Sequence, residues 1–258
     1  MVNGPPFRLT KWYLDCVSET GDAAIFYGAH VSWRGIHLRY SSLLCHLEGH
    51  ITCKTSVGAP FPTQPNENTL AIEAPQLGIT GTWDRLDPRV DKNLYEDNGG
   101  VVHWDCVQPR AAAQLRIGDH ALEGLGYAEC LTLTIPPWRL PLQSLQWGRW
   151  LSPTGGLIWI VWTGPSARSW IWRNGAESID ISEVQLDKIV GLQLDRGVTL
   201  RDGRLGKTVL PAAPFLARIF PRAIFGIHET KWLSRGTLAR AGTPERGWAI
   251  HEVVEWNT

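Results

Sequence analysis

The sequence predicts an all-β protein with little helix, built from antiparallel barrel or sandwich domains. Short runs of β-branched and aromatic residues recur along nearly the whole chain, and turn-forming residues separate almost all of them. Helical spacing is confined to the segment around Ala212–Arg218, which Pro214 interrupts and Pro221 follows. The pairs Asn174-Gly175 and Asp202-Gly203 favour tight hairpin turns. Many short strands joined by regular hairpins are typical of a closed barrel or a sandwich.

The expected strands follow one another in three series, each recognised by alternating or continuous β-formers. The first series comprises Lys11–Glu19, Ala23–Trp33, Ile36–Leu44, Leu70–Glu73, Ile79–Asp84 and Gly100–Gln108. The second comprises Ala112–Ile117, His120–Thr134, Leu145–Leu151, Leu157–Thr163 and Ser169–Arg173. The third comprises Ile181–Leu186, Gly191–Leu194, Gly197–Arg201, Ala223–Leu233, Gly236–Arg240 and Gly247–Glu255.

Two long loops and one domain boundary are expected between these strands. Gly58–Asn68 is rich in proline and asparagine, and Asp84–Gly99 is rich in charge, so both are predicted to be surface loops. The proline-rich segment Ile135–Pro141 divides the strand series into two similar halves, which predicts domains over residues 1–135 and 136–258. Two short internal similarities agree with a duplicated barrel: Trp12–Val17 with Trp104–Val107, and Ile227–Trp232 with Ile250–Trp256.

Composition excludes several classes of protein. The 25 basic and 25 acidic residues give a formal net charge of zero, which argues against nucleic acid or an anionic membrane as a partner. The five cysteines are scattered and form no C-x-x-C pair, so we expect reduced core residues. No apolar run reaches membrane-spanning length, and the N-terminus lacks a secretory pattern, which favours a cytoplasmic location. The 14 tryptophans must fill a core or line a pocket.

A set of motifs in fixed order resembles a known superfamily. The motifs are Trp104-Asp-Cys106, Gly124-Leu-Gly-Tyr-Ala-Glu129, Pro137-Trp-Arg-Leu-Pro141, Leu145-Gln-Trp-Gly-Arg149 and the closing Gly247-Trp-Ala-Ile-His-Glu252. Together they resemble the hydroxyneurosporene synthase (carotenoid hydratase) superfamily, which is related to lipocalin-like Diels–Alderases. The resemblance implies two lipocalin-like (calycin) domains packed together. It also implies a cofactor-free protein that acts on a hydrophobic polyene, by hydration or by cyclisation.

Glu129 is the first candidate for catalysis because it lies on an apolar strand face. Residues two apart share a face, so Tyr127 and Glu129 join Leu125, Leu131 and Leu133. A buried carboxyl group has a raised pKa, which suits a general acid, and Tyr127 is a second candidate proton donor. The structural alternative is a buried ion pair of Glu129 with Arg149 that braces two neighbouring strands.

The last strand repeats this pattern with Glu252, which shares a face with Ile250 and Val254 and is a second candidate acid. His251 lies on the opposite face and is expected to face solvent or the neighbouring domain. His228 shares its face with Trp232 and is expected to reach a pocket.

His103 and Asp105 have the spacing of an acid/base pair on one strand face. The alternative is that Asp105 holds a turn or a backbone amide while His103 lies at the rim. The eight histidines never form an H-E-x-x-H motif, so we expect no metal. Neither a G-x-S-x-G elbow nor a G-x-G-x-x-G or P-loop motif is present, so we expect no nucleotide cofactor.

The expected function is that of a cofactor-independent lyase or cyclase which folds an apolar, polyene-like or isoprenoid-like small molecule in a barrel or inter-domain pocket. The alternative is a non-catalytic carrier or sensor of a hydrophobic metabolite, and a structural interaction domain with a filled core is a third hypothesis. The expected substrate-binding side chains are those of Trp104, Trp147, Arg149, Trp159, Trp162, His228 and Trp232.

Overall fold

A computed structural model describes residues 7–58, 60–178, 191–204, 226–239 and 243–256. The chain divides into two compact units, Met1–Leu140 and Pro141–Thr258, and the division falls inside the proline-rich segment. The described elements are antiparallel strands and two short 3₁₀ helices. The expected strand Ile181–Leu186 and the helical spacing around Ala212–Arg218 lie outside the described residues.

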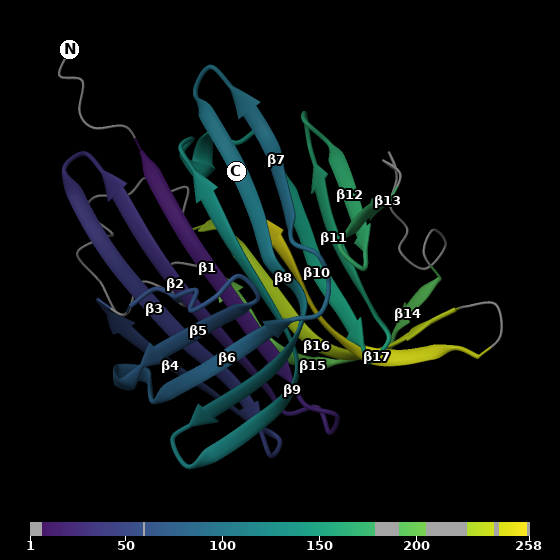
Figure 1. Cartoon of the computed structure of the whole chain (residues 1–258). Helices are drawn as coiled ribbons and strands as arrows, with labels where there is room; N and C mark the ends of the chain where they lie inside the picture. The colour runs from purple at the N-terminus through teal and green to yellow at the C-terminus, as the bar shows by residue number, and fades with distance from the viewer. Residues whose placement is uncertain (1–6, 59, 179–190, 205–225, 240–242, 257–258) are drawn as a thin grey trace. The chain divides into compact units, whose positions relative to one another are not determined.

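The first unit contains one nine-stranded sheet, shown in purple to teal in Figure 1. Its strands are β1 (Arg8–Val17), β2 (Ala23–Trp33), β3 (Ile36–Leu47), β4 (His50–Val57), β5 (Thr69–Ala74), β6 (Ile79–Arg85), β7 (Val90–Asp97), β8 (Gly100–Ile117) and β9 (His120–Leu133). The sheet order is β4-β3-β2-β1-β9-β8-β6-β5, and β7 pairs with β8. The 3₁₀ helix η1 (Pro75–Leu77), which follows one edge strand, contacts β4 at the other edge, so the sheet curls toward a closed barrel.

The second unit contains one eight-stranded sheet. Its strands are β10 (Ser144–Ser152), β11 (Gly155–Thr163), β12 (Arg168–Arg173), β13 (Ala176–Ser178), β14 (Leu192–Leu194), β15 (Val198–Arg204), β16 (His228–Leu238) and β17 (Glu245–Glu255). The sheet order is β13-β12-β11-β10-β17-β16-β14, and β15 pairs with β16. The second 3₁₀ helix, η2 (Pro137–Arg139), ends the first unit.

The two units share a topology, except that β5 has no counterpart among the described strands of the second unit. In each unit the first strand pairs with the last, β1 with β9 and β10 with β17, and joins two antiparallel meanders. In each, the strand before the last pairs along its outer edge with two shorter strands, β8 with β6 and β7, and β16 with β14 and β15. The predicted all-β, lipocalin-like fold class is therefore confirmed. The two short sequence similarities are unrelated to this structural repeat, because both segments of each similar pair lie in the same unit.

Pro109 explains why β8 changes partner along its length. Residues Gly100–Cys106 of β8 pair with β7, and Ala111–Ile117 pair with β6. Proline has no N–H to donate to a sheet ladder, and it tends to occur at bulges. The pairing of β8 with β9 accordingly shifts register on both sides of Gln108. We predicted two strands here, but the chain forms one strand of 18 residues.

Several other sequence predictions are corrected. The segment Asp84–Gly99 is not a loop throughout, because β7 forms within it. The strand β4 was not predicted, and β16 continues through the expected gap between Leu233 and Gly236. Asp202-Gly203 is no hairpin turn, because both residues pair with β16 inside β15. The expected turn at Asn174-Gly175 is confirmed, with φ of 52° and 75° at the two residues.

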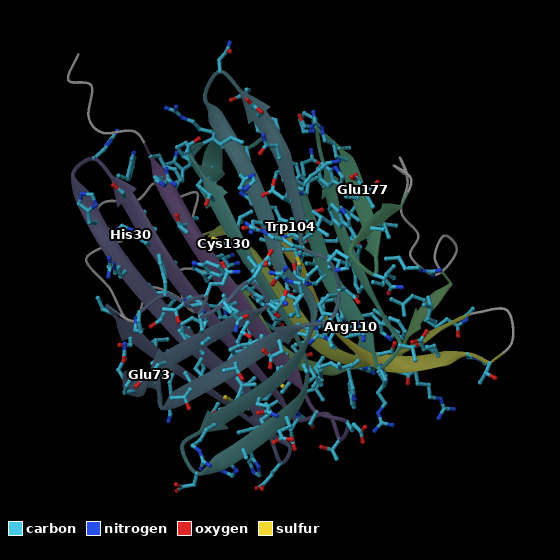
Figure 2. All side chains as sticks on the ribbon, viewed as in Figure 1. His30, Glu73, Trp104, Arg110, Cys130 and Glu177 are labelled. Carbon is cyan, nitrogen blue, oxygen red and sulfur yellow. The ribbon has the colours of Figure 1, made fainter. Side chains whose placement is uncertain are left out.

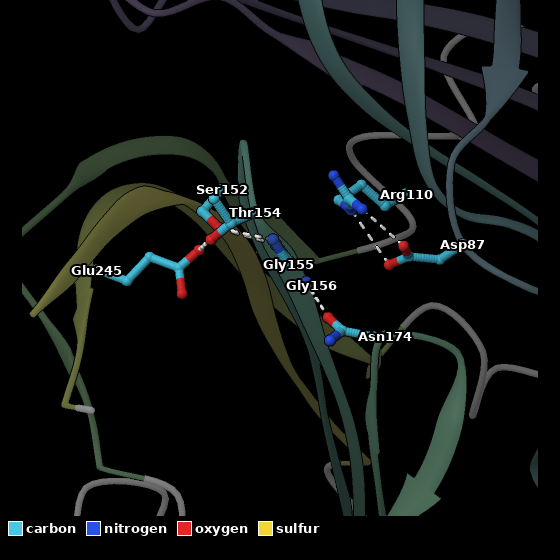
Figure 3. Close-up of polar contacts among 8 residues, drawn as sticks. All are labelled: Asp87, Arg110, Ser152, Thr154, Gly155, Gly156, Asn174 and Glu245. Carbon is cyan, nitrogen blue, oxygen red and sulfur yellow. Dashed lines mark hydrogen bonds and ion pairs between the residues drawn. The ribbon is translucent and has the colours of Figure 1, made fainter. Parts of the chain in front are cut away.

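Polar contacts secure the β10–β11 turn of the second unit. Figure 3 shows that the hydroxyl groups of Ser152 and Thr154 donate to the carboxylate of Glu245, at the start of β17. The Gly156 N–H donates to Asn174 Oδ1 over 2.9 Å, which links the turn to the β12–β13 hairpin. In the first unit, Arg110 donates to Asp87 over 2.8 Å in a largely buried ion pair.

The five cysteines, all within described residues, form no disulfide. Cys16, Cys45 and Cys106 are buried, whereas Cys130 is half-buried and Cys53 is exposed on β4. The expectation of core cysteines is therefore right for three positions and wrong for Cys53.

Gly148 of β10 leaves room for the Trp159 ring of β11 beside His251 of β17. A Cβ atom at this position would lie 2.1 Å from the Trp159 ring and 2.8 Å from His251 Cβ. We expect Gly148→Ala to lower the free energy of unfolding by about 1–3 kcal/mol, because overpacking displaces a buried indole. Urea denaturation measures this. Gly28→Ala is the matched control, since its Cβ would meet only side chains, the nearest at 3.2 Å, and equal losses in both variants would contradict the prediction.

Candidate active site

The side chain of Glu129 lies at the centre of a polar cluster on one face of the first sheet. Glu129 is on β9, directly opposite Tyr13 of β1. Trp104 Nε1 donates to Glu129 Oε2 over 2.5 Å, and the Tyr127 hydroxyl donates to the same oxygen over 2.5 Å. All three side chains are buried. The cluster therefore holds one carboxylate oxygen with two neutral donors.

Strand register explains how these three residues meet. Tyr127 and Glu129 are two residues apart on β9 and so share a face. Trp104 of β8 pairs with Leu131, the next residue of β9 on that face. Figure 2 labels Trp104 on β8 and Cys130 on the adjacent strand β9. Cys130 directly follows Glu129 in the sequence, so its side chain is on the opposite face of the sheet.

From the order of the family-like motifs we expected Trp104–Cys106, Gly124–Glu129 and Leu145–Arg149 to lie on converging strands. The first two motifs are on strands that pair with each other. The third is on β10 of the second unit, so its part of the expectation stays a prediction.

The second carboxylate oxygen of Glu129, Oε1, makes no hydrogen bond with any residue that the structure describes. Oε2 therefore fixes the orientation of the carboxyl group, and Oε1 is left for a further partner. A positioned carboxyl oxygen of this kind can donate or accept a proton.

Two residues that we did not predict, Tyr13 and Asp15, complete the cluster. Tyr13 makes edge-to-face ring contacts with Tyr27 at 5.3 Å and with Tyr127 at 5.9 Å. Asp15 of β1 pairs with Tyr127 and is fully buried. A pattern in the sequence could have identified them: alternate residues of β1, which share one face of the strand, are Lys11, Tyr13 and Asp15, and all three carry a polar group.

Burial keeps the hydroxyl of Tyr127 protonated. Desolvation raises the pKa of Tyr127 well above its usual value, and the nearby Cys106 and Glu129 add to the effect. Burial likewise raises the pKa of the Cys106 thiol. Tyr127 is therefore a neutral hydrogen-bond donor to Glu129 at physiological pH.

His103 and Asp105 are on the same strand but have separate partners. Arg89 donates to both carboxylate oxygens of Asp105, over 2.6 and 2.5 Å. His103 contacts Asn93 at 3.0 Å and Asp91 at 3.2 Å. Each residue is thus engaged with β7 or with the segment before it, and no direct His103–Asp105 hydrogen bond forms among the described residues.

Glu252 has a different environment from Glu129, although both lie on the last strand of their unit. The ammonium group of Lys231, on β16, forms an ion pair with Glu252. Lys231 is fully buried, also lies 3.6 Å from Glu229, and is 5.5 Å from the centre of the Trp147 ring. A nearby ammonium group favours the ionised, carboxylate form of a glutamate side chain. Glu252 is therefore the counter-ion of a buried cation, whereas Glu129 is held by neutral donors.

We expected His251 to face solvent or the neighbouring domain, but its described contacts are with residues of its own unit. Its ring stacks on Trp232 at 5.2 Å and lies 6.4 Å from Trp159, and its Nε2 is 3.0 Å from Ser234 Oγ. Burial, with a contribution from Lys231, lowers the pKa of His251 to about 4. The side chain is held neutral in an aromatic stack within its own unit.

This depressed pKa predicts an acid-sensitive contribution to stability. Between the ordinary pKa of about 6.5 and the folded value of about 4, the unfolded chain binds the His251 proton more readily than the folded chain does. The free energy of unfolding should therefore fall as pH drops from 6.5 toward 4, by about 3 kcal/mol from this residue. Denaturation of wild type and His251→Gln at several pH values measures it. Parallel pH profiles for the two proteins would refute the assignment.

The remaining expected binding residues lie on two different faces of the second sheet. Trp159 belongs to the buried core cluster, and Trp162 lies on the opposite face in an edge contact with Trp170 at 5.6 Å. His228 is paired with Asp202 at 2.7 Å, near the surface. The expected pocket residues His228 and Trp232 thus share a face, and Trp147 lies on the other.

Arg149 is fully buried and donates to the Trp248 carbonyl over 2.9 Å. Glu129 and Arg149 are in different sheets, so they do not brace neighbouring strands as we expected. Glu129 belongs to the first unit and Arg149 to the second, and the ion pair between them stays a prediction.

An open depression of about 490 Å³ lies on the first unit, over β5, β6, β8 and β9. Its lining includes the outward polar side chains of Glu73, Thr80, Gln114 and Arg116, but neither Glu129 nor Glu252. Among the described residues, no group of three or more His, Cys, Asp or Glu side chains gathers to hold a metal ion. No described helix is both long and apolar enough to cross a bilayer.

Comparison with solved structures identifies the fold. No protein-family model and no curated protein sequence matches the chain. CghA matches with a TM-score of 0.59 at 12% identity, over 97% of this chain and 88% of that chain. A putative AttH (NE1406) from Nitrosomonas europaea matches with a TM-score of 0.56 at 12% identity, over 97% and 93% of the two chains. Kievitone hydratase from Nectria haematococca matches with a TM-score of 0.55 at 10% identity, over 97% and 90%.

The chain shares the fold of these proteins. The predicted resemblance is confirmed at the level of the lipocalin-like fold. At 10–12% identity the likeness shows the fold alone, and the chemistry must be argued from the side chains.

Proposed function

We propose that the chain is a cofactor-independent lyase or cyclase for an apolar polyene or isoprenoid-like small molecule, with Glu129 as its acid and base. The observation that carries the proposal is the asymmetric hydrogen bonding of Glu129. Trp104 and Tyr127 hold Oε2, while Oε1 has no partner among the described residues. The fold shared with a protein named as a hydratase supports the same class of reaction.

The chemistry needs only one carboxyl group. Protonated Glu129 donates its proton from Oε1 to a carbon of the substrate double bond, and the other alkene carbon becomes a cation. In hydration, water adds to that cation and returns a proton to Oε1. In cyclisation, a second double bond adds to the cation, and loss of a ring proton to Oε1 completes the reaction. Trp104 and Tyr127 keep their hydrogen bonds to Oε2 in both protonation states of Glu129.

The aromatic neighbours of Glu129 support this class of reaction. Tyr13, Tyr27 and Trp104 present rings on the same face as the carboxyl group. The faces of aromatic rings attract a cation, which stabilises the developing positive charge on the substrate. Because the rings are rigid, they also orient a flexible polyene, and orientation can contribute several kcal/mol to lowering the barrier.

Incubation of the purified chain with a panel of conjugated polyenes and isoprenoid olefins tests the proposal. Mass spectrometry should find a product that has gained the mass of one water, or an isomer that has lost a double bond. In heavy water the product should carry deuterium at carbon, and Glu129→Gln should not form it. Retention of an unmodified lipid in native mass spectrometry, without turnover of any panel member, would instead favour a carrier.

A further inference from the structure

Lys11 lies on the same face of the first sheet as Glu129. It is on β1, opposite Leu131 of β9 and Ala29 of β2. Strand alternation places Lys11, Tyr13 and Asp15 on one face, and Leu131 and Glu129 share that face on the adjacent strand. A residue and its diagonal neighbour on an adjacent strand are about 7–8 Å apart, so Lys11 and Glu129 are close enough to contact one small molecule.

The ammonium group of Lys11 has no carboxylate partner within 4.0 Å among the residues that the structure describes. Its described contact is with the ring of Tyr27, 5.5 Å from the ring centre. The side chain is half-buried. A cation–π contact at a partly exposed site is weak and does not neutralise the ammonium group, so Lys11 can still bind an anion.

Aromatic contacts connect Lys11 to Glu129 without a break. Tyr27 packs edge-on against Tyr13 with an interplanar angle of 79°, and Tyr13 packs against Tyr127 at 67°. Tyr127 in turn donates to Glu129. Lys11 and Glu129 are therefore diagonal neighbours on this face. The rings of Tyr13 and Tyr27 lie in the same row across the strands as Glu129, and Tyr127 lies one row further from Lys11.

We propose that Lys11 binds an anionic oxygen of the ligand, such as a carboxylate, enolate or phenolate oxygen. The ligand is then an apolar molecule with an acidic head group at Lys11, and its chain extends past the Tyr13 ring toward Glu129. The assignment of the reacting double bond to Glu129 rests on the proposed function, whereas the anion site at Lys11 does not. An ammonium group is a compact point charge and a guanidinium group is larger and planar. Arginine at position 11 should therefore keep most of the affinity for the anionic ligand and lose a part of it.

Binding of cis-parinaric acid and of its methyl ester tests the proposal, with energy transfer from tryptophan to the polyene as the signal. Wild type should bind the acid about 10-fold more tightly than the ester, a difference of about 1.4 kcal/mol. Lys11→Met should lose this preference because it binds the acid more weakly and the ester with unchanged affinity. Lys11→Arg should retain most of the preference. Lys54→Met, on exposed β4, is the matched control and should bind as wild type.

Equal affinity of wild type for the acid and the ester, binding of neither probe, or an unchanged preference in Lys11→Met would overturn the anion site. Glu129→Gln separates this proposal from the proposed function. It should keep the preference for the acid while losing turnover. If Lys11→Met loses the preference and Glu129→Gln turns over normally, the anion site stands and the catalytic role of Glu129 falls.

Discussion

Replacing Glu129 with glutamine is expected to lower turnover about 10²–10⁴-fold and to leave the folded chain intact. Glutamine has the shape of glutamate, and its carbonyl oxygen can accept the hydrogen bonds from Trp104 and Tyr127. It cannot donate a proton to carbon or take one from water. Rate measurement on a converted substrate and a thermal melt of the same preparation together give the result.

Glu129→Ala is the matched comparison for stability. Alanine leaves the buried Tyr127 hydroxyl and Trp104 indole without their acceptor, at a cost of about 1–3 kcal/mol for each group. It should therefore melt well below Glu129→Gln. If the glutamine variant itself lost about 3–5 kcal/mol, the buried ion pair with Arg149 would be supported, and Glu129 would be a structural residue.

Replacing Lys231 with methionine is expected to lower the free energy of unfolding by about 3–5 kcal/mol. Methionine fills a similar volume, but the carboxylates of Glu252 and Glu229 lose their shared cation in a buried environment. Arg201, 3.6 Å from Glu229, compensates only one of the two. Urea denaturation measures the loss, and Lys54→Met on the exposed strand β4 should change stability by less than about 0.5 kcal/mol.

The double variant Lys231→Met with Glu252→Gln makes this test specific. Removing the carboxylate that lost its partner should recover part of the stability, since contacting residues are energetically coupled. If the loss of stability in the double variant equals the sum of the losses in Lys231→Met and Glu252→Gln, the two residues do not interact.

The alternation of apolar and polar residues predicted most of the strands and the face of Glu129. It failed for a strand that contains a bulge and for a strand that is exposed on both faces. The strand β7 was taken for a loop because charged residues lie between Val90 and Leu94, and because a bulge between Asn93 and Tyr95 breaks the alternation. The strand β4 was missed because nearly all of its residues are exposed, so burial leaves no pattern in the sequence.

The candidate site could be predicted only along single strands. Tyr127 and Glu129 were found together because they are two residues apart. The donor role of Trp104, the contribution of Tyr13 and the pairing of Lys231 with Glu252 depend on which strands are neighbours and in what register. Those pairings join residues far apart in the sequence, and the pattern within one strand carries no information about them.

The pairing of first and last strands in each unit determines the order in which the chain can fold on the ribosome. The strand β1 reaches its full set of partners only when β9 has left the exit tunnel, because Leu9 pairs with Leu133. Until then the meander β1–β4 has an open edge at β1, and closure of such a distant contact is slow. Exposed strand edges invite pairing with other chains, so nascent chains that end before β9 should depend most on chaperones.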